Sequence, residues 1–398
     1  MLHLKAPLDH NPLIQNLRKI YYAFEGDSRD VVNDDKFHVS SGLDNLQQCL
    51  QFAWGARLSS DIQLRICLAC LASDETTGES DTQNVMRTFW SHRFILASRS
   101  PYFLAELGRL ADAEKDGRIS NDLQVLTLPS PPFTPRSLFF ILDFIYTGTP
   151  TYYYRAYGLG NAFAIYKGAK FLMIDSLVNE IRTRIAEEFF HGLFNAALPQ
   201  EEYGFLVERK WHRMVELGCV CELCAGGLTR ILEFSLSREV DDEILARGAR
   251  RAAVGMFGER WCSRRFSQLP HHIREIILSD MNEFVTPDNF FRILFSSERA
   301  LHELNNVNDS WTGTVKKLVI TVRDMLDGVL LAQPEFCFEC EEWLDIMHSD
   351  IAGKLEGFQS REEEVKWIVH AISRASQKDE ALKLYKVCLL SCCTFKAT

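Results

Sequence analysis

The chain has 398 residues and a formal net charge of −10, because its 54 acidic side chains outnumber its 44 basic ones. A hydrophobic content of 46% and a charged content of 25% are typical of a globular protein and exclude a largely disordered chain. The acidic balance repels phosphate groups, so we expect no direct binding to nucleic acid and no membrane association. The length fits two or three domains.

The start of the chain and its cysteine content predict an intracellular protein. Residues 1–11 lack the basic and apolar segments of a secretory signal, and no stretch has the roughly 20 apolar residues that a membrane span requires. We therefore expect a soluble protein of the cytoplasm, the nucleus or both. Thiols stay reduced there, so the 12 cysteines are expected to be buried apolar residues, metal ligands or redox groups.

The first half of the chain predicts a small sheet among helices. Residues 1–42 are polar and mixed, which predicts an irregular arm, and an amphipathic helix follows over 43–54. From residue 60 apolar and polar residues alternate, which is typical of a strand with one buried face. Extended patterns return over 85–90 and 123–128, so the sheet should have three strands.

Helix starts are marked by proline and capping residues. Pro101 and Pro135 suit a first helical turn, where an amide donor has no partner in the helix, and Thr134 can cap the free amides. Helical spacing continues to about residue 190. Beyond residue 195 strand patterns fade, and helical segments dominate two blocks, 196–282 and 283–398.

Four blocks of the first half carry a family resemblance. The blocks are Ser60-Asp61-Ile62, the segment from Ser91 to Phe103 (SHRFILASRSPYF), the segment from Phe144 to Gly148 (FIYTG), and the segment from Ala169 to Leu177. In order and spacing they resemble a BTB/POZ domain. The resemblance covers roughly residues 45–195, and the region 217–269 further resembles fungal BTB proteins with helical tails, of the cullin-3 adaptor type.

This resemblance implies an α+β fold over residues 43–195, with a small, mainly antiparallel sheet flanked by helices. An all-α region should follow, made of a BACK-like extension over 196–282 and a C-terminal helical region over 283–398. The family implies a non-catalytic, homodimerising interaction module, often the substrate adaptor of a cullin-3-type ubiquitin ligase, here with an unknown protein substrate. The alternative is a BTB scaffold or regulatory protein, acting in complex assembly or indirectly in transcription, with no ligase link.

The resemblance also suggests roles for particular residues. Asp61 and His92 match a buried polar pair that holds the fold together. Tyr146 is either a core ring with a tethered hydroxyl or part of the cullin-facing surface. Cullin-binding members carry a hydrophobic–x–Glu turn shortly after the helix that contains Tyr102 and Phe103. In this chain that stretch offers Leu110 and Asp112. The predicted first helix sits where family members dimerise, and its interface candidates are Leu43, Leu46 and Leu50.

The most specific motif outside this resemblance is a C-x-C-x-x-C turn formed by Cys219, Cys221 and Cys224. Such a turn can place three thiolates around one zinc ion, which accepts four sulfur or nitrogen ligands. The fourth ligand stays open among His212, Cys262 and the Cys337–Cys340 pair. The alternative is that no cofactor binds and that these cysteines are small buried side chains at a helix start.

A basic run stands out in an otherwise acidic chain. It could contact an acidic partner or nucleic acid, or form ordinary solvated helix faces with local ion pairs. We found no G-x-S-x-G motif, Walker loop or dinucleotide fingerprint, so no catalytic residues are predicted and no enzyme is expected. The run comprises Arg247, Arg250, Arg251, Arg260, Arg264 and Arg265.

Overall fold

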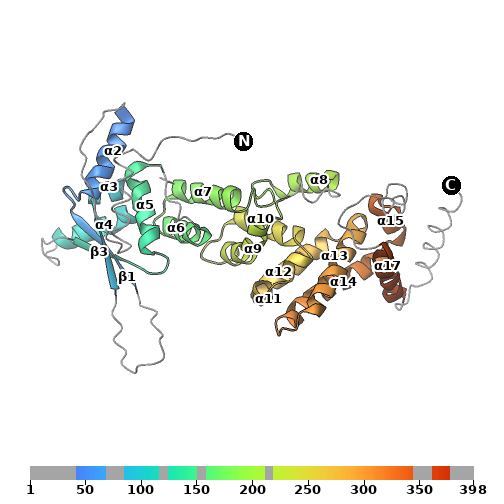
Figure 1. Ribbon diagram of the computed structural model, residues 1–398. Coiled ribbons are helices and arrows are strands. Elements are labelled where there is room, and N and C mark those ends of the chain that lie inside the picture. Colours follow the sequence, from blue (N-terminus) through green and yellow to red (C-terminus); the bar gives the residue numbers. More distant parts are fainter. Residues whose placement is uncertain are drawn as a thin grey trace, which may run out of the picture. The chain divides into compact units, whose positions relative to one another are not determined.

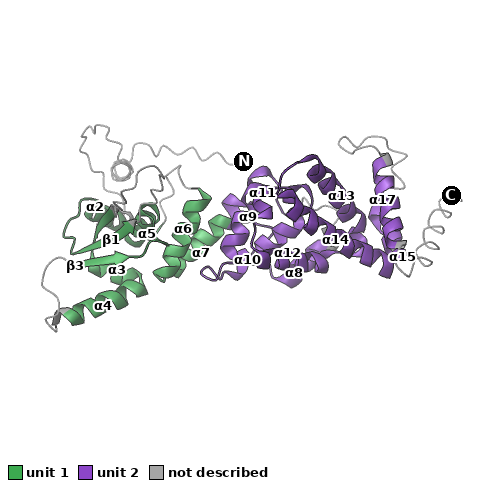
Figure 2. Ribbon diagram, turned by 90° about the horizontal axis from the view of Figure 1, so that it is seen from below, with its two compact units in different colours: residues 1–185 green, residues 186–398 purple. Residues whose placement is uncertain are grey.

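The computed structural model describes residues 42–68, 85–115, 124–149, 158–210, 218–343 and 361–376. The chain divides into two compact units, Met1–Ile185 and Ala186–Thr398, which are coloured separately in Figure 2. Except for Gly42, the predicted N-terminal arm lies outside the described residues. Among the described helices, none is long and apolar enough to cross a membrane.

The first unit is built on a three-stranded sheet with the order β2-β1-β3, of which β1 and β3 are labelled in Figure 1. The central strand β1 (Ile62–Leu68) pairs antiparallel with β2 (Val85–Ser91) and parallel with β3 (Gln124–Leu128). The sheet is therefore mixed, and the expected antiparallel arrangement holds for one of its two pairings. Ile62, Leu64 and Ile66 are all buried, as the predicted alternation requires.

Six helices accompany this sheet in the described residues of the first unit, and α5 (Pro135–Thr147) is buried along most of its length. Thr134 begins α5 by accepting a hydrogen bond from the Ser137 amide at 3.0 Å, and Gly148 ends it in a left-handed conformation. The predicted start of α5 is thus confirmed. The other helices are α2 (Gly42–Gly55), α3 (Arg93–Arg99), α4 (Pro101–Lys115), α6 (Leu159–Phe171) and α7 (Asp175–Arg184).

All described secondary structure of the second unit is helical. A short π-helical turn, η1 (Ile185–Phe189), leads into it, and its core includes Trp261, which stacks on Phe266 and donates its indole N–H to the Ala253 carbonyl. Its helices are α8 (Gln200–Lys210), α9 (Glu222–Ser235), α10 (Glu243–Gly255), η3 (Glu259–Trp261), α11 (Arg264–Ser267), α12 (His271–Phe284), η4 (Pro287–Asn289), α13 (Phe290–Asn306), α14 (Thr312–Ala332), α15 (Pro334–Glu339) and α17 (Arg361–Ser376).

The second unit opens with a left-handed turn over residues 191–195. All five residues have positive φ angles, between 40° and 91°, and four of them are not glycine. Such a conformation costs roughly 1–2 kcal/mol per ordinary L-residue, so surrounding contacts must stabilise it. Leu193 and Phe194 are buried, and the Phe194 ring packs so closely on Gly218 and Gly255 that a Cβ atom at either glycine would clash with it.

Candidate functional site

Tyr146 joins three elements of the first unit through its ring and hydroxyl. The ring is fully buried and stacks on Trp54 of α2 with a centroid distance of 5.2 Å. The hydroxyl oxygen accepts the His92 backbone N–H at 3.0 Å and lies 2.7 Å from His92 Nδ1. Burial raises the pKa of Tyr146. Tyr146 is therefore a core ring with a tethered hydroxyl, and its placement as a cullin-facing candidate is corrected because its side chain has no exposed surface.

Asp61 and His92 both anchor the start of α3, but through different partners. Asp61 Oδ1 accepts the Arg93 backbone N–H at 2.7 Å, while His92 Nε2 lies 2.6 Å from the Leu58 carbonyl oxygen. The expectation of a buried pair is wrong for Asp61, which is exposed because it sits at the surface end of β1; His92 is half-buried. Both side chains still connect the start of α3 to the residues that precede β1.

The outer surface of α3 and α4 carries apolar side chains that the sequence patterns did not identify. Phe94 on α3 is 83% exposed and Leu104 on α4 is 60% exposed. On the inner side, Leu96 and Phe103 are buried, and Ser100 donates its hydroxyl to the Leu172 carbonyl. Exposed large apolar groups of this kind are typical of protein-interaction surfaces.

The predicted hydrophobic–x–acid turn lies inside α4, because this helix continues to Lys115. Leu110 is half-buried and Asp112 is exposed. Residues two apart on a helix point to different sides, so these two side chains do not form one turn-like epitope. The expectation that they follow the helix is therefore wrong.

One side of α2 packs on α5 and the other carries apolar groups. Gln51 donates to Asp143 at 3.2 Å and Gln47 donates to the Thr147 carbonyl. On the outer side, Leu46 is 57% exposed and Phe52 is 47% exposed. Of the predicted dimer candidates, Leu46 is exposed, Leu50 is half-buried, and the side chain of Leu43 lies outside the described residues.

Four metal-binding side chains meet at the beginning of α9. Cys221 occupies the N-cap position of this helix, Cys224 lies in its first turn, and Cys219 precedes it. Their sulfurs lie 3.6, 3.5 and 3.3 Å, respectively, from Nδ1 of His191, which starts the left-handed turn. All four ligand atoms lie within 4.8 Å of one another.

The partner of the three cysteines is thus His191, which the sequence patterns did not suggest. Cys262 lies apart, 3.7 Å from the carbonyl oxygens of Gly258 and Ala300. Cys340 lies 3.1 Å from the Cys337 carbonyl oxygen and accepts the Trp343 amide, so this pair is packed in the core. His212 lies outside the described residues.

The beginning of α9 also favours negative charge on sulfur. The backbone N–H of Cys224 faces the Cys221 sulfur and is the main reason that the pKa of Cys221 is lowered to about 6. Burial instead raises the pKa of Cys224. The first turn of α9 therefore favours the thiolate form of Cys221, which is the form that binds a metal ion.

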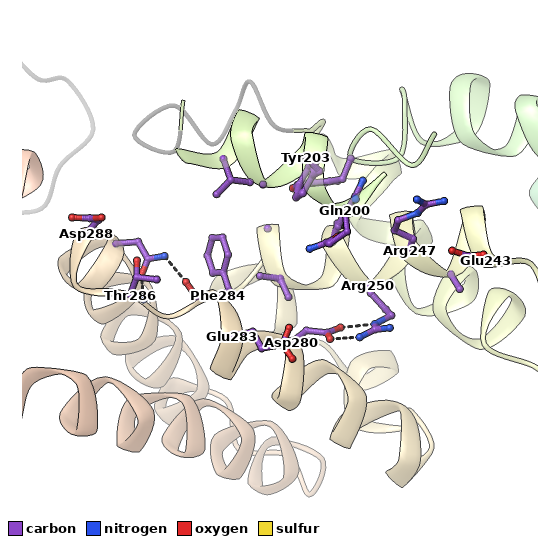
Figure 3. A pocket seen from close by; sticks show the side chains of 18 residues that line it. Gln200, Tyr203, Glu243, Arg247, Arg250, Asp280, Glu283, Phe284, Thr286 and Asp288 are labelled. Atoms are coloured by element: carbon purple, nitrogen blue, oxygen red, sulfur yellow. Dashed lines mark hydrogen bonds and ion pairs between the residues drawn. The ribbon is translucent and has the colours of Figure 1, made fainter. Parts of the chain in front are cut away.

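A cavity of about 790 Å³ opens elsewhere in the second unit, between α8, α10, α12 and η4 (Figure 3). Arg250 forms an ion pair with Asp280 at its edge, drawn with dashed lines in the figure. Acidic and basic groups both line the cavity, so its charge is mixed and does not favour phosphate. Its charged residues are Glu243, Arg247, Arg250, Arg251, Asp280, Glu283 and Asp288.

Arg251 reaches back from α10 to the left-handed turn. Its guanidinium donates to the Asn195 carbonyl and to the Gln200 side chain, both at 2.9 Å, and lies 3.8 Å from the Tyr203 ring centroid. Two of the six arginines of the predicted basic run are thus engaged, Arg250 by Asp280 and Arg251 by carbonyl groups. These contacts favour a structural role for these two arginines over binding to nucleic acid.

Residues 80–188 match the BTB/POZ domain family. No curated protein matches the chain. The family match starts before β2, whereas the structure shows that β1 pairs with both other strands of the same sheet. The folded domain therefore begins before residue 80 and includes β1.

Proposed function

The chain contains a BTB/POZ domain, a protein-interaction module, and from this premise we propose that it is a dimeric substrate adaptor of a cullin-3-type ubiquitin ligase. The first unit would bind the cullin and a second copy, while the helical unit would hold the protein substrate. No bond is broken by the adaptor itself. It acts by raising the effective concentration of the substrate near the ligase.

The exposed apolar surface of α3 and α4 is the observation that carries this proposal. Phe94 and Leu104 are large, apolar and mostly solvent-exposed, although the same two helices bury Leu96 and Phe103 against the core. A partner that covered both side chains would remove roughly 1.5–3 kcal/mol of unfavourable hydration for each. Asp112, exposed farther along α4, adds a charged group that can set the partner's orientation.

Co-purification of a tagged full-length chain with a cullin-3-type scaffold tests the adaptor role. We expect Phe94→Glu and Leu104→Glu each to abolish co-purification, because a buried carboxylate would disrupt the apolar contact. The matched control is Phe205→Glu, which changes a phenylalanine that is 64% exposed on α8 of the other unit. Absence of a cullin from the unmutated chain would overturn the adaptor role, and unchanged binding by both variants would overturn the assigned surface.

Dimerisation is proposed to use the outer side of α2. Leu46 and Phe52, with Cys49 between them, form an exposed stripe at helical spacing. The double variant Leu46→Glu/Phe52→Glu should be a monomer by light scattering, while the single variant Leu104→Glu stays a dimer. A double variant that still dimerises would contradict this interface.

The alternative function is a dimeric scaffold with no link to a ligase. One observation favours it: Leu110 and Asp112 lie inside a continuous helix and not in the hydrophobic–x–Glu turn of cullin-binding members. A chain that dimerises through α2 and co-purifies with other proteins but with no cullin would support the scaffold over the adaptor.

A further inference from the structure

The three cysteines beside His191 have an arrangement that hydrogen bonds to the imidazole do not explain. Their sulfurs all converge on one atom, Nδ1 of His191, at 3.3–3.6 Å. An imidazole nitrogen carries either one proton or one lone pair, so it can complete one hydrogen bond and not three. Three sulfur atoms this close to a single nitrogen are instead typical of four ligand atoms arranged around one metal ion.

The spacing fits a tetrahedral zinc ion. With Zn–S near 2.3 Å and Zn–N near 2.0–2.1 Å, the edge from nitrogen to sulfur in a tetrahedron is about 3.6 Å. The three observed distances are 3.3, 3.5 and 3.6 Å, and all four ligand atoms lie within 4.8 Å of one another. We infer that His191, Cys219, Cys221 and Cys224 form a structural zinc site in the helical unit.

The donor set favours zinc over the other common divalent ions. Thiolate and imidazole are soft ligands, whereas magnesium and calcium prefer oxygen. The site supplies four protein ligands and leaves no position for water or substrate, which is typical of structural and not catalytic zinc. Each thiol that binds the ion releases its proton to solvent.

The position of the site at the beginning of α9 accommodates its charge. Three thiolates and one Zn²⁺ leave a net charge of −1. The first-turn amides of a helix and its dipole stabilise negative charge at this end, and α9 is 14 residues long. Cys221 at the cap and Cys224 in the first turn place two of the sulfurs directly there.

Zinc would also stabilise the left-handed turn that opens the second unit. His191 is the first residue of that turn and has a φ angle of 49°, and its three partners lie 28 or more residues later in the sequence. One ion would therefore join the entry of the unit to the start of α9. Because the four ligands converge only in the folded chain, binding energy of the metal adds to the stability of this unit.

Elemental analysis of the full chain, purified under reducing conditions, tests the site. We expect one zinc ion per chain, and its loss in His191→Ala and in Cys224→Ser. His191→Cys should retain zinc, because a fourth thiolate can replace the imidazole. Cys262→Ser is the matched control: it removes a cysteine of the same unit and should keep the full zinc content. No zinc and no uptake of added zinc by the unmutated chain would overturn the inference, as would loss in the control.

A measurement on the unmutated chain avoids variants that fail to fold. Removing zinc with a chelator should make three thiols newly reactive and speed hydrogen exchange in residues 186–235, and added zinc should reverse both changes. Exchange in residues 85–115 should not change. Chelation that alters neither thiol reactivity nor exchange would contradict a structural zinc site, whatever the outcome of the cullin experiments.

Discussion

The two units differ in the contacts that hold together elements distant in sequence. In the first unit, neutral hydrogen bonds join buried groups: the Tyr146 hydroxyl reaches His92, and the Ser100 hydroxyl donates to the Leu172 carbonyl at 2.6 Å. In the second unit, the opening turn is held by close packing against glycines and by the guanidinium of Arg251. Directional bonds therefore join elements in both units, and the opening turn of the second unit depends in addition on backbone contacts that tolerate no added volume.

Glycine substitutions give the sharpest test of this difference. We expect Gly248→Ala on α10 to lower the free energy of unfolding of the second unit by about 3 kcal/mol. Its new Cβ would lie 2.7 Å from the Leu193 carbonyl oxygen and 2.5 Å from Ala196 Cβ, so the backbone of the left-handed turn would have to move. Hydrogen exchange resolved by segment measures the loss, which should concentrate in residues 186–255.

Two other glycines serve as comparisons for Gly248→Ala. Gly168→Ala in the first unit would meet Ile141 Cδ1 at 2.6 Å and the Phe133 ring at 3.0 Å. Both are side-chain atoms and no backbone has to move, so we expect a loss of only about 1 kcal/mol. Gly226→Ala on α9 meets nothing within 4 Å and should stabilise its helix by about 0.5–1 kcal/mol. Equal losses for Gly248→Ala and Gly168→Ala would remove the distinction between the units.

Two neighbouring arginines provide the next test, within the second unit. Arg251→Gln should cost about 2–3 kcal/mol, because it removes two hydrogen bonds at 2.9 Å and the contact with Tyr203 while leaving the Asn195 carbonyl without this donor. Arg250→Gln should cost at most about 1 kcal/mol, because its ion pair with Asp280 is exposed on the arginine side. Chemical denaturation followed by exchange in α10 distinguishes them, and a reversed order would contradict the structural role of Arg251.

Tyr146→Phe tests the directional bonds of the first unit. The ring should still stack on Trp54, but the His92 amide loses its acceptor, so we expect a loss of about 1–2 kcal/mol at neutral pH. Burial raises the folded-state pKa of Tyr146 above the value near 10 of an unfolded tyrosine. Its contribution is therefore complete below about pH 10 and is lost as the pH rises further, so the variant and the unmutated chain should converge in alkali.

Tyr102→Phe is the control for the expected loss at neutral pH. Its ring packs on Phe103 and Phe171, and its hydroxyl does not bond to His92. We expect its unfolding free energy to stay within about 0.5 kcal/mol of the unmutated chain at neutral pH. A loss as large as that of Tyr146→Phe would show that the hydrogen bond to His92 is not the reason for the loss in Tyr146→Phe.

Local patterns were sufficient to predict much of the first unit. The alternation from Ile62 to Leu68 identified β1, and Thr134-Pro135 identified the start of α5, because both signals depend on neighbouring residues. The end of α4 was misplaced because its last turns are polar. Those residues still favour a helix, and Glu106 and Arg109 form an ion pair one turn apart within it.

The candidate sites depended on information that local patterns do not hold. The C-x-C-x-x-C spacing identified three members of the thiol cluster, but His191 reaches them through a left-handed turn whose geometry is fixed by Phe194, Gly218 and Gly255. Likewise, Tyr146 has the same apolar spacing whether it faces the core or a partner. Its burial follows from the stacking of Trp54, a residue 92 positions earlier that no periodicity links to it.

The smallest predicted effect concerns two acidic residues of the second unit. Burial, and then the nearby charge of Glu259, raise the pKa of Glu303. Glu303→Gln should therefore stabilise the unit at neutral pH by up to about 0.5 kcal/mol, whereas Glu233→Gln, at an exposed position of α9, should change nothing measurable. Because the folded-state pKa lies above the unfolded one, the unmutated chain regains this stability as the pH falls, and the gain from Glu303→Gln should disappear below about pH 4. A gain that persisted in acid would show that packing, and not the charge of a partly buried carboxylate, limits stability at this point.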